Sequence, residues 1–283
     1  MSAIVDSFFP LLALIFLGWF LRRRDLLGPG AARELTAFVV SYAGAMVLTF
    51  LATFWWLPRT QSFADRCLDS FGATYANSGF IGIPLSVLLL GHDALIPATI
   101  ATLLTAVLLF AVGIVLLELG GGAAGASPLA SVGKAVRAVA RNPLVVATVL
   151  GGLWSAGGRT LPDAPHRLLE LLAGAAGPCA LVSIGALLAQ PAPVGVQATP
   201  LAPVVVAKLV LLPGVCALLA IAVFHLPPVW ATTAVLLNAL PTCTGPFMLA
   251  EFYERDVARA SRIMFVTTML SLVSVPVCIV MLR

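Results

Sequence analysis

The sequence predicts an all-α, polytopic membrane protein, and three observations support this fold class. Of its 283 residues, 60% are hydrophobic and only 10% are charged, whereas soluble proteins carry about 25% charged residues. The apolar runs are long and aliphatic, without the alternation of about ten residues that is typical of an outer-membrane barrel. Two of these runs are interrupted by Gly and Pro at matching places in the two halves of the chain.

Nine apolar segments, bounded by charged residues, Gly or Pro, are candidate membrane helices. They cover residues 6–21, 33–57, 67–90, 95–118, 141–157, 165–190, 200–224, 228–251 and 257–282. The first is predicted to be a retained span and not a signal peptide, because Arg22, Arg23 and Arg24 follow its apolar part instead of preceding it.

A polar, Gly-rich and basic connection at residues 119–140 divides the chain into halves 1–118 and 141–283. Each half has one interrupted segment near its end, "NSGFIGIP" within 67–90 and "NALPTCTGP" within 228–251. Paired interruptions of this kind predict two inverted repeats whose broken helices cross near the membrane midplane. The first repeat has four recognisable segments and the second has five, so one helix-equivalent is missing early in the chain.

The distribution of Lys and Arg tests this count. If all nine segments cross once and the first loop is cytoplasmic, seven loop cations lie inside and eight outside. The segment 33–57 could instead enter the membrane and return to the same side, or be the remainder of two spans whose middle is lost. In either case twelve loop cations lie inside and three outside. The second arrangement is favoured, and it places Arg33 and Arg59 on the same side of the membrane.

The interruptions predict a binding site, because Pro and Gly leave backbone groups unpaired and these are tolerated in a membrane only beside protein or a water-filled cavity. Half-helix N-termini suit a carboxylate, half-helix C-termini suit a cation, and amides or hydroxyls serve either. The candidate substrate-binding residues are Asn77, Ser78, Gly79, Gly82, Pro84, Lys208, Asn238, Pro241, Thr242, Thr244 and Pro246.

Plainer interpretations exist for several of these residues. Gly and Pro also occur in membrane helices as simple kinks. Lys208 is either a functional intramembrane cation or a side chain that snorkels to the interface. Asp69 and Glu251 are predicted to be interfacial. Arg255, Arg259 and Arg262 are predicted to form a solvated cytoplasmic turn.

Other classes of function have no support in the sequence. The five Cys and three His are scattered without ligand spacing, so we expect no metal, no disulfide and no cofactor. No nucleophile with a neighbouring base is evident, so we expect no enzyme. The net charge of +4 comes from loop cations that orient the chain in the lipid bilayer and does not indicate nucleic acid.

Several stretches, among them "YANSGFIGIPL", "RNPLVVATVLGGLW", "KLVLLPG" and "ALPTCTGPFMLAEFYERD", resemble the auxin efflux carrier family of bacterial permeases over nearly the whole chain. The resemblance implies ten helices in two inverted five-helix repeats, as in bile acid and sodium symporters, and a homodimer. It also implies small organic anions such as auxin or malonate as substrates. Relatives have more residues where "ELTAFVVSY" runs directly into "AGAMVLTFLATFWW".

The predicted function is therefore secondary transport of a small mono- or dicarboxylate by alternating access, in the inner membrane of a bacterium. Coupling to H⁺, coupling to Na⁺ and uniport are all left open by the sequence. The alternative is a degenerate, non-transporting membrane protein of the same fold, because part of the second and third helices is missing.

Overall fold

The computed structural model describes residues 30–121, 160–188 and 200–282, with isolated positions between 137 and 157. In these residues the chain forms helices, and the extended backbone pairs only through one isolated bridge. Four helices are long and apolar enough to cross a membrane, Ala32–Trp56, His92–Glu118, Ala202–Val223 and Val257–Met281. The chain is thus a multi-pass membrane protein. The predicted span at 6–21 and most of the one at 141–157 lie outside the described residues.

The elements follow the order that the apolar segments predict. They are α2 (Ala31–Trp56), α3 (Phe63–Thr74), η1 (Ser78–Gly82), α4 (Ile83–Leu90), η2 (His92–Ala94), α5 (Leu95–Leu103), η3 (Leu104–Leu109), α6 (Phe110–Gly121), α9 (Asp163–Leu188), α10 (Ala202–Val206), η4 (Ala207–Leu211), α11 (Leu212–Ala217), η5 (Leu218–Val223), α12 (Pro228–Ala239), α13 (Gly245–Phe252) and α14 (Val257–Met281).

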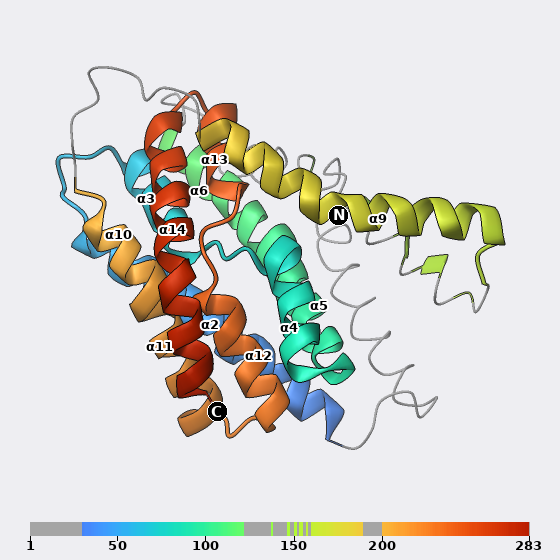
Figure 1. Cartoon of the computed structure of the whole chain (residues 1–283). Coiled ribbons are helices and arrows are strands. Elements are labelled where there is room, and N and C mark those ends of the chain that lie inside the picture. Colours follow the sequence, from blue (N-terminus) through green and yellow to red (C-terminus); the bar gives the residue numbers. More distant parts are fainter. Residues whose placement is uncertain are drawn as a thin grey trace, which may run out of the picture.

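The helices form a bundle with two distinct ends (Figure 1). The first, which we name the α13–α14 end, also holds the start of α3 and the end of α6. The second, the α4–α5 end, also holds the start of α2, the start of α12 and the end of α14. The largest group of buried side chains lies between α2, α5, α11 and α12 and includes Phe38, Tyr42 and Leu236. A second group, around Phe71, Leu117 and Leu249, joins α3, α6 and α13.

Helix α2 corrects the predicted course of the segment 33–57. It is one uninterrupted helix of 26 residues, so its length is roughly 39 Å and it does not turn back. Arg33 lies at its start, at the α4–α5 end, and Arg59 follows its end. The expectation that these two arginines lie on the same side is therefore wrong. The other interpretation of the segment 33–57, two spans that have lost their middle and are fused, agrees with the single continuous helix α2.

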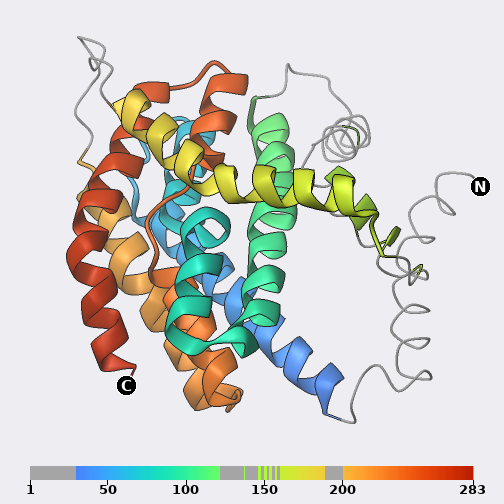
Figure 2. The same cartoon turned by 45° about the vertical axis from the view of Figure 1, so that its right-hand side comes forward.

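Helix α9 also differs from a simple span. In both views it lies across the bundle instead of alongside α14, and it contacts α14 and η1 (Figures 1 and 2). Its first turns carry Asp163, His166, Arg167 and Glu170, which makes this part less apolar than the four long helices. The division of the chain into repeats 1–118 and 141–283 stays a prediction.

Candidate functional site

The two interrupted segments meet in the middle of the bundle. The first breaks at Tyr75–Asn77, between α3 and η1, and the second breaks between α12 and α13. Ala76 and Thr242 form an antiparallel bridge, in which the Asn77 N–H donates to the Pro241 carbonyl at 2.9 Å and the Cys243 N–H donates to the Tyr75 carbonyl at 3.0 Å. The predicted crossing of two broken helices is therefore present.

Local sequence explains why each segment is broken where it is. Ser62 caps α3 by accepting the Asp65 N–H, and the helix ends at Thr74. After the break the chain first makes a wide turn, in which the Gly82 N–H reaches the Asn77 carbonyl at 3.1 Å. Pro246 then lies in the first turn of α13, where proline fits because the first turn of a helix needs no N–H donor. Pro84 follows the wide turn inside the continuous helix Ser78–Leu90.

The structure locates the break relative to Pro84. The chain is not helical at Tyr75–Asn77, and the following helix begins at Ser78 with the wide turn, so Pro84 lies inside this helix directly after the wide turn. Pro84 is exposed on the outer side of α4, so it is not brought together with the other candidate residues. Gly79 is half-buried beside Thr102, while Pro241 and Pro246 are buried.

Two glycines permit the close approach of the crossing segments. A Cβ at Gly82 would lie 2.4 Å from Leu237 Cδ2, and a Cβ at Gly245 would lie 2.4 Å from Tyr75 Cζ. In each case a side chain of one interrupted segment packs against the glycine of the other. Gly82 was predicted as a site residue, whereas Gly245 was not, because a glycine beside Pro246 is also expected in an ordinary helix start.

Polar side chains at the crossing are buried without partners. Among the described residues, Asn77 Oδ1 and both amide atoms of Asn238 have no hydrogen-bond partner, although the two residues are only 2% and 0% exposed. Ser86 Oγ, one helical turn beyond the wide turn, is also buried and unpaired. An unsatisfied buried polar atom costs about 1–3 kcal/mol, so several together indicate a place that a ligand completes.

Hydroxyl groups of the crossing instead bind the backbone. Thr242 Oγ1 donates to the Gly72 carbonyl at 2.7 Å, and the Thr242 N–H donates to Thr267 Oγ1 at 3.2 Å. Thr244 is half-buried beside Cys243, and Ser78 is buried close to the Tyr42 hydroxyl. Thr242 therefore links α3, α14 and the second break, which is a positioning role.

Lys208 reaches the crossing from η4. Its side chain is fully buried, and Nζ donates to the Asn238 carbonyl at 2.9 Å. Of the two interpretations that the sequence allowed, snorkelling to the interface is wrong, because a snorkelling ammonium would be exposed. The ammonium instead lies at the end of α12, where helix carbonyls lack partners in the helix itself.

The structure also brings Tyr42 and Thr105 to the crossing, which the sequence analysis missed. The Tyr42 hydroxyl and Thr105 Oγ1 are 3.0 Å apart, both side chains are buried, and Tyr42 lies close to Ser78. The sequence feature that could have indicated these two residues is one polar side chain inside each of two otherwise apolar segments. A single polar side chain of this kind is common in membrane helices, so neither residue stands out on its own.

A buried ion pair lies between the crossing and the α13–α14 end. Arg259 Nε donates to the two carboxylate oxygens of Asp69 at 2.8 and 2.9 Å, and Gln61 Nε2 donates to Asp69 Oδ2 at 3.0 Å. Asp69 is 3% and Arg259 6% exposed. The prediction of an interfacial Asp69 and of a fully solvated arginine turn is therefore wrong for this pair, while Glu251 is exposed as expected.

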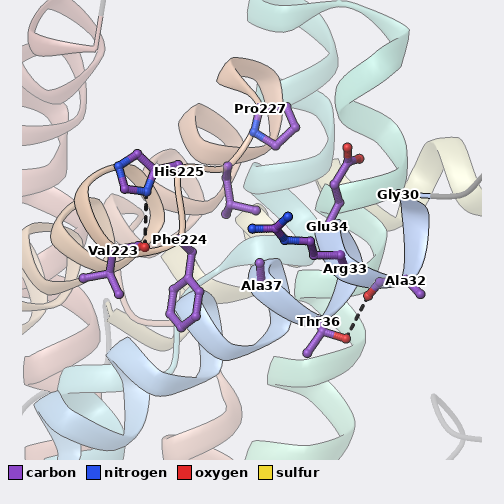
Figure 3. Close-up of a pocket in the computed structure, with 11 residues that line it drawn as sticks. Gly30, Ala32, Arg33, Glu34, Thr36, Ala37, Val223, Phe224, His225 and Pro227 are labelled. Atoms are coloured by element: carbon purple, nitrogen blue, oxygen red, sulfur yellow. Dashed lines mark hydrogen bonds between the residues drawn. The ribbon is translucent and has the colours of Figure 1, made fainter.

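A cavity of about 950 Å³ lies away from the crossing, at the α4–α5 end, between the start of α2 and the turn from η5 to α12 (Figure 3). Arg33, Glu34 and His225 line it, and His225 Nδ1 lies 3.2 Å from the Val223 carbonyl oxygen. None of the predicted site residues lines this cavity. A smaller cavity is lined by Asp69, Pro246 and Arg259.

Comparisons with known proteins agree with this architecture. A family model described as "Membrane transport protein" matches residues 44–279, which is most of the chain. The match begins inside α2, close to the point where the sequence resemblance placed the shortened join. The chain is also 31% identical over 261 residues to a protein of Rhizobium meliloti (strain 1021) that carries the name "Putative malonate transporter". That alignment covers 88% of this chain and 79% of the relative.

Proposed function

Because the chain belongs to the membrane transport protein family, the auxin efflux carriers that its sequence resembles, we propose that it is a secondary transporter of a small organic anion. The substrate class is a mono- or dicarboxylate of about the size of malonate. Transport proceeds by alternating access around the crossing of the two broken helices. Its relatives are transporters, which points away from an enzyme.

The unpaired polar atoms at the crossing carry this proposal. A carboxylate needs hydrogen-bond donors, and the Asn238 amide can donate without the desolvation cost of a second buried charge. Asn77 presents its amide from the other break, and rotation of an amide by 180° exchanges its donor and acceptor. Lys208 adds a positive charge next to Asn238. Together these groups complement an anion better than a cation.

The malonate-like size of the substrate is supported by the printed name of the relative, which applies to that protein. The close contacts at Gly82 and Gly245 favour a small anion, since the crossing segments leave little room between them. The helix that begins at Ser78 and the helix α13 also direct the positive ends of their dipoles toward the breaks.

In this proposal the part of the protein that moves during transport consists of the crossing and the helices bonded to it. Two backbone hydrogen bonds join the breaks, Thr242 attaches them to Gly72 and Thr267, and Asp69 pairs with Arg259 across the repeats. These links make the two broken helices and α14 move as one body. In such a movement the amides would face first one side of the membrane and then the other.

The arginines orient the protein. Arg59, Arg66, Arg255 and Arg262 lie at or near the α13–α14 end, whereas Arg33 lies at the α4–α5 end. By the positive-inside rule the α13–α14 end faces the cytoplasm. In this proposal the membrane is the plasma membrane of a bacterium, and the cavity beside Arg33 opens to the outside.

Uptake of radiolabelled malonate into proteoliposomes tests the proposal. The wild-type protein is expected to accumulate label, and the double variant Asn77→Ala/Asn238→Ala is expected to lose at least 90% of the initial rate, which corresponds to about 1.4 kcal/mol or more. Thr99→Ala is the control, because Thr99 is exposed and its hydroxyl bonds only to its own helix. Uptake that the double variant leaves unchanged would exclude the crossing as the site.

A second candidate function follows from α2. Where the resembled family has two helices joined by a loop, this chain has one continuous helix, and the family match begins only at Gly44. A scaffold shortened in this way favours a membrane protein that no longer transports. Folded protein that takes up none of a panel of mono- and dicarboxylates would support this candidate over the transporter.

A further inference from the structure

Lys208 is unusual among the buried charges of the protein. Its ammonium is fully buried, and its one hydrogen bond is to the Asn238 carbonyl. Among residues 30–121, 160–188 and 200–282, no carboxylate lies within ion-pair distance of it, whereas buried Arg259 is paired with Asp69. A buried ammonium without a counter-ion is costly, so its environment must supply negative potential in another form.

The end of α12 supplies that potential. The last carbonyls of a helix lack intrahelical donors and carry the negative end of its dipole. In a continuous α-helix the Thr242 N–H would donate to the carbonyl of Asn238, four residues earlier. Here it donates to Thr267 Oγ1 instead. The Asn238 carbonyl is thereby left open toward the crossing, and Lys208 binds it. In broken-helix transporters such carbonyl ends are where a transported cation is coordinated.

The equivalent end of the first half-helix is closed by neutral donors. The Gly72 carbonyl accepts from the Thr242 hydroxyl, and the Tyr75 carbonyl accepts from the Cys243 N–H. The Asn77 carbonyl accepts from the Gly82 N–H within the wide turn. The protein therefore donates to carbonyls at both half-helix ends, and only the α12 end receives a positive charge.

We infer that the Lys208 ammonium is a tethered cation that occupies the carbonyl end of α12, where a free sodium ion would otherwise bind, and that transport does not depend on Na⁺. This inference rests on the proposed function for its consequence in transport, but the placement of the cation stands on the structure alone. The positive charge remains at the crossing throughout the cycle and moves with it. It serves the anion as a counter-charge without being released.

Thermal unfolding of the purified full-length protein tests the placement without any transport assay. Melting curves are recorded in NaCl and in choline chloride at equal concentration. For the wild type we expect the same midpoint in both salts, because the carbonyl site is already occupied. A ligand held at about 100 times its Kd raises the midpoint by several degrees in a chain of this size. A rise of that kind in NaCl alone would overturn the inference.

Two variants separate a tethered cation from a merely structural lysine. Lys208→Ser removes the ammonium and leaves space beside the Asn238 carbonyl, so we expect it to gain a midpoint shift of about 2–4 °C that is specific for Na⁺. Lys208→Met removes the charge but fills the space, so it should show no difference between the salts. Folded Lys208→Ser without any Na⁺ response would contradict the inference. If neither variant folds, the wild-type comparison decides.

Malonate uptake in the same two salts distinguishes failure of the inference from failure of the proposed function. Initial rates that agree within twofold support the inference. Rates at least tenfold higher in NaCl overturn it while confirming that the protein transports an anion. If no uptake occurs in either salt, the proposed function fails, and the melting curves still decide whether Lys208 occupies a cation position.

Discussion

The two breaks of the crossing differ in charge although they resemble each other in shape. Each has a short non-helical stretch followed by a helix that contains proline, and each packs against a glycine of the other. At the first break the surrounding donors are neutral, namely the Thr242 hydroxyl and backbone N–H groups. At the second break a buried ammonium binds the backbone.

This difference suggests a division of roles between the two breaks. The first break is the hydrogen-bonded joint that fixes how the two segments cross. The second break carries the charge that would attract the proposed anion, and its Asn238 amide has no hydrogen-bond partner among the described residues. Two breaks of similar shape can thus differ in charge, because polar residues from outside the breaks, Lys208 and Tyr42, reach them from different helices.

The largest expected effect comes from breaking the ion pair that joins α3 to α14. Arg259→Met leaves the Asp69 carboxylate buried without its partner, which costs about 3–5 kcal/mol. We therefore expect a large fall in the unfolding midpoint in detergent. Arg262→Met is the matched control, because Arg262 is only half-buried and bonds to the carbonyl of its own helix at 3.4 Å.

The same pair can be removed without leaving a charge. Asp69→Leu combined with Arg259→Met replaces it by apolar groups, which in buried pairs is often neutral or stabilising. The double variant should therefore be more stable than Arg259→Met alone. If Arg259→Met melts at the same temperature as Arg262→Met, the ion pair contributes little to the stability of the contact between α3 and α14.

The next effect compares the two amides directly. Asn238 lies beside the ammonium, so Asn238→Ala is expected to raise the half-saturating malonate concentration roughly 10–100-fold, the range for a hydrogen bond to a charged group. Asn77 belongs to the neutral break, and Asn77→Ala should raise it only about 2–10-fold. Initial uptake rates over a range of malonate concentrations measure both. If both variants raise the half-saturating malonate concentration equally, the two breaks do not differ in their contribution to malonate binding.

A smaller effect is expected at the joint itself. Thr242→Val keeps the shape of the side chain but leaves the buried Gly72 carbonyl without its donor, at a cost of about 1–3 kcal/mol. Thr242→Ser retains the hydroxyl and is the control. The measurement is the unfolding midpoint of the three proteins in detergent. Indistinguishable midpoints for valine and threonine would show that Gly72 finds another donor.

The sequence predicted the helices and the crossing well because both depend on local patterns. Apolar runs define the helices, and Gly, Pro and Asn mark the two breaks, which the structure places side by side. The first interruption was predicted over Asn77–Pro84, and the structure places the non-helical residues at its beginning, at Tyr75–Asn77, followed by the wide turn at Ser78–Gly82.

The remaining features depend on contacts between distant residues. Asp69 and Arg259 are 190 positions apart, and nothing in either neighbourhood indicates the other. Similarly, Lys208 could not be assigned to the crossing until the packing of η4 against α12 was known. The placement of Arg33 and Arg59 on one side was predicted wrongly because a count of loop cations treats every arginine near a helix end alike, and Arg33 lies at the end of α2 opposite to Arg59.

The smallest expected effect concerns the hydroxyl pair of the neutral break. Tyr42→Phe removes a buried hydroxyl 3.0 Å from Thr105 Oγ1, which also has the Ala101 carbonyl as a partner, so the loss should be about 0.5–1.5 kcal/mol. Unfolding midpoints of Tyr42→Phe, Thr105→Val and the double variant give the coupling between the two groups. Since this pair is neutral, the half-saturating malonate concentration should change less than in Asn238→Ala. A Tyr42→Phe protein that loses malonate affinity as strongly as Asn238→Ala would instead place the anion between the two breaks, in equal contact with both.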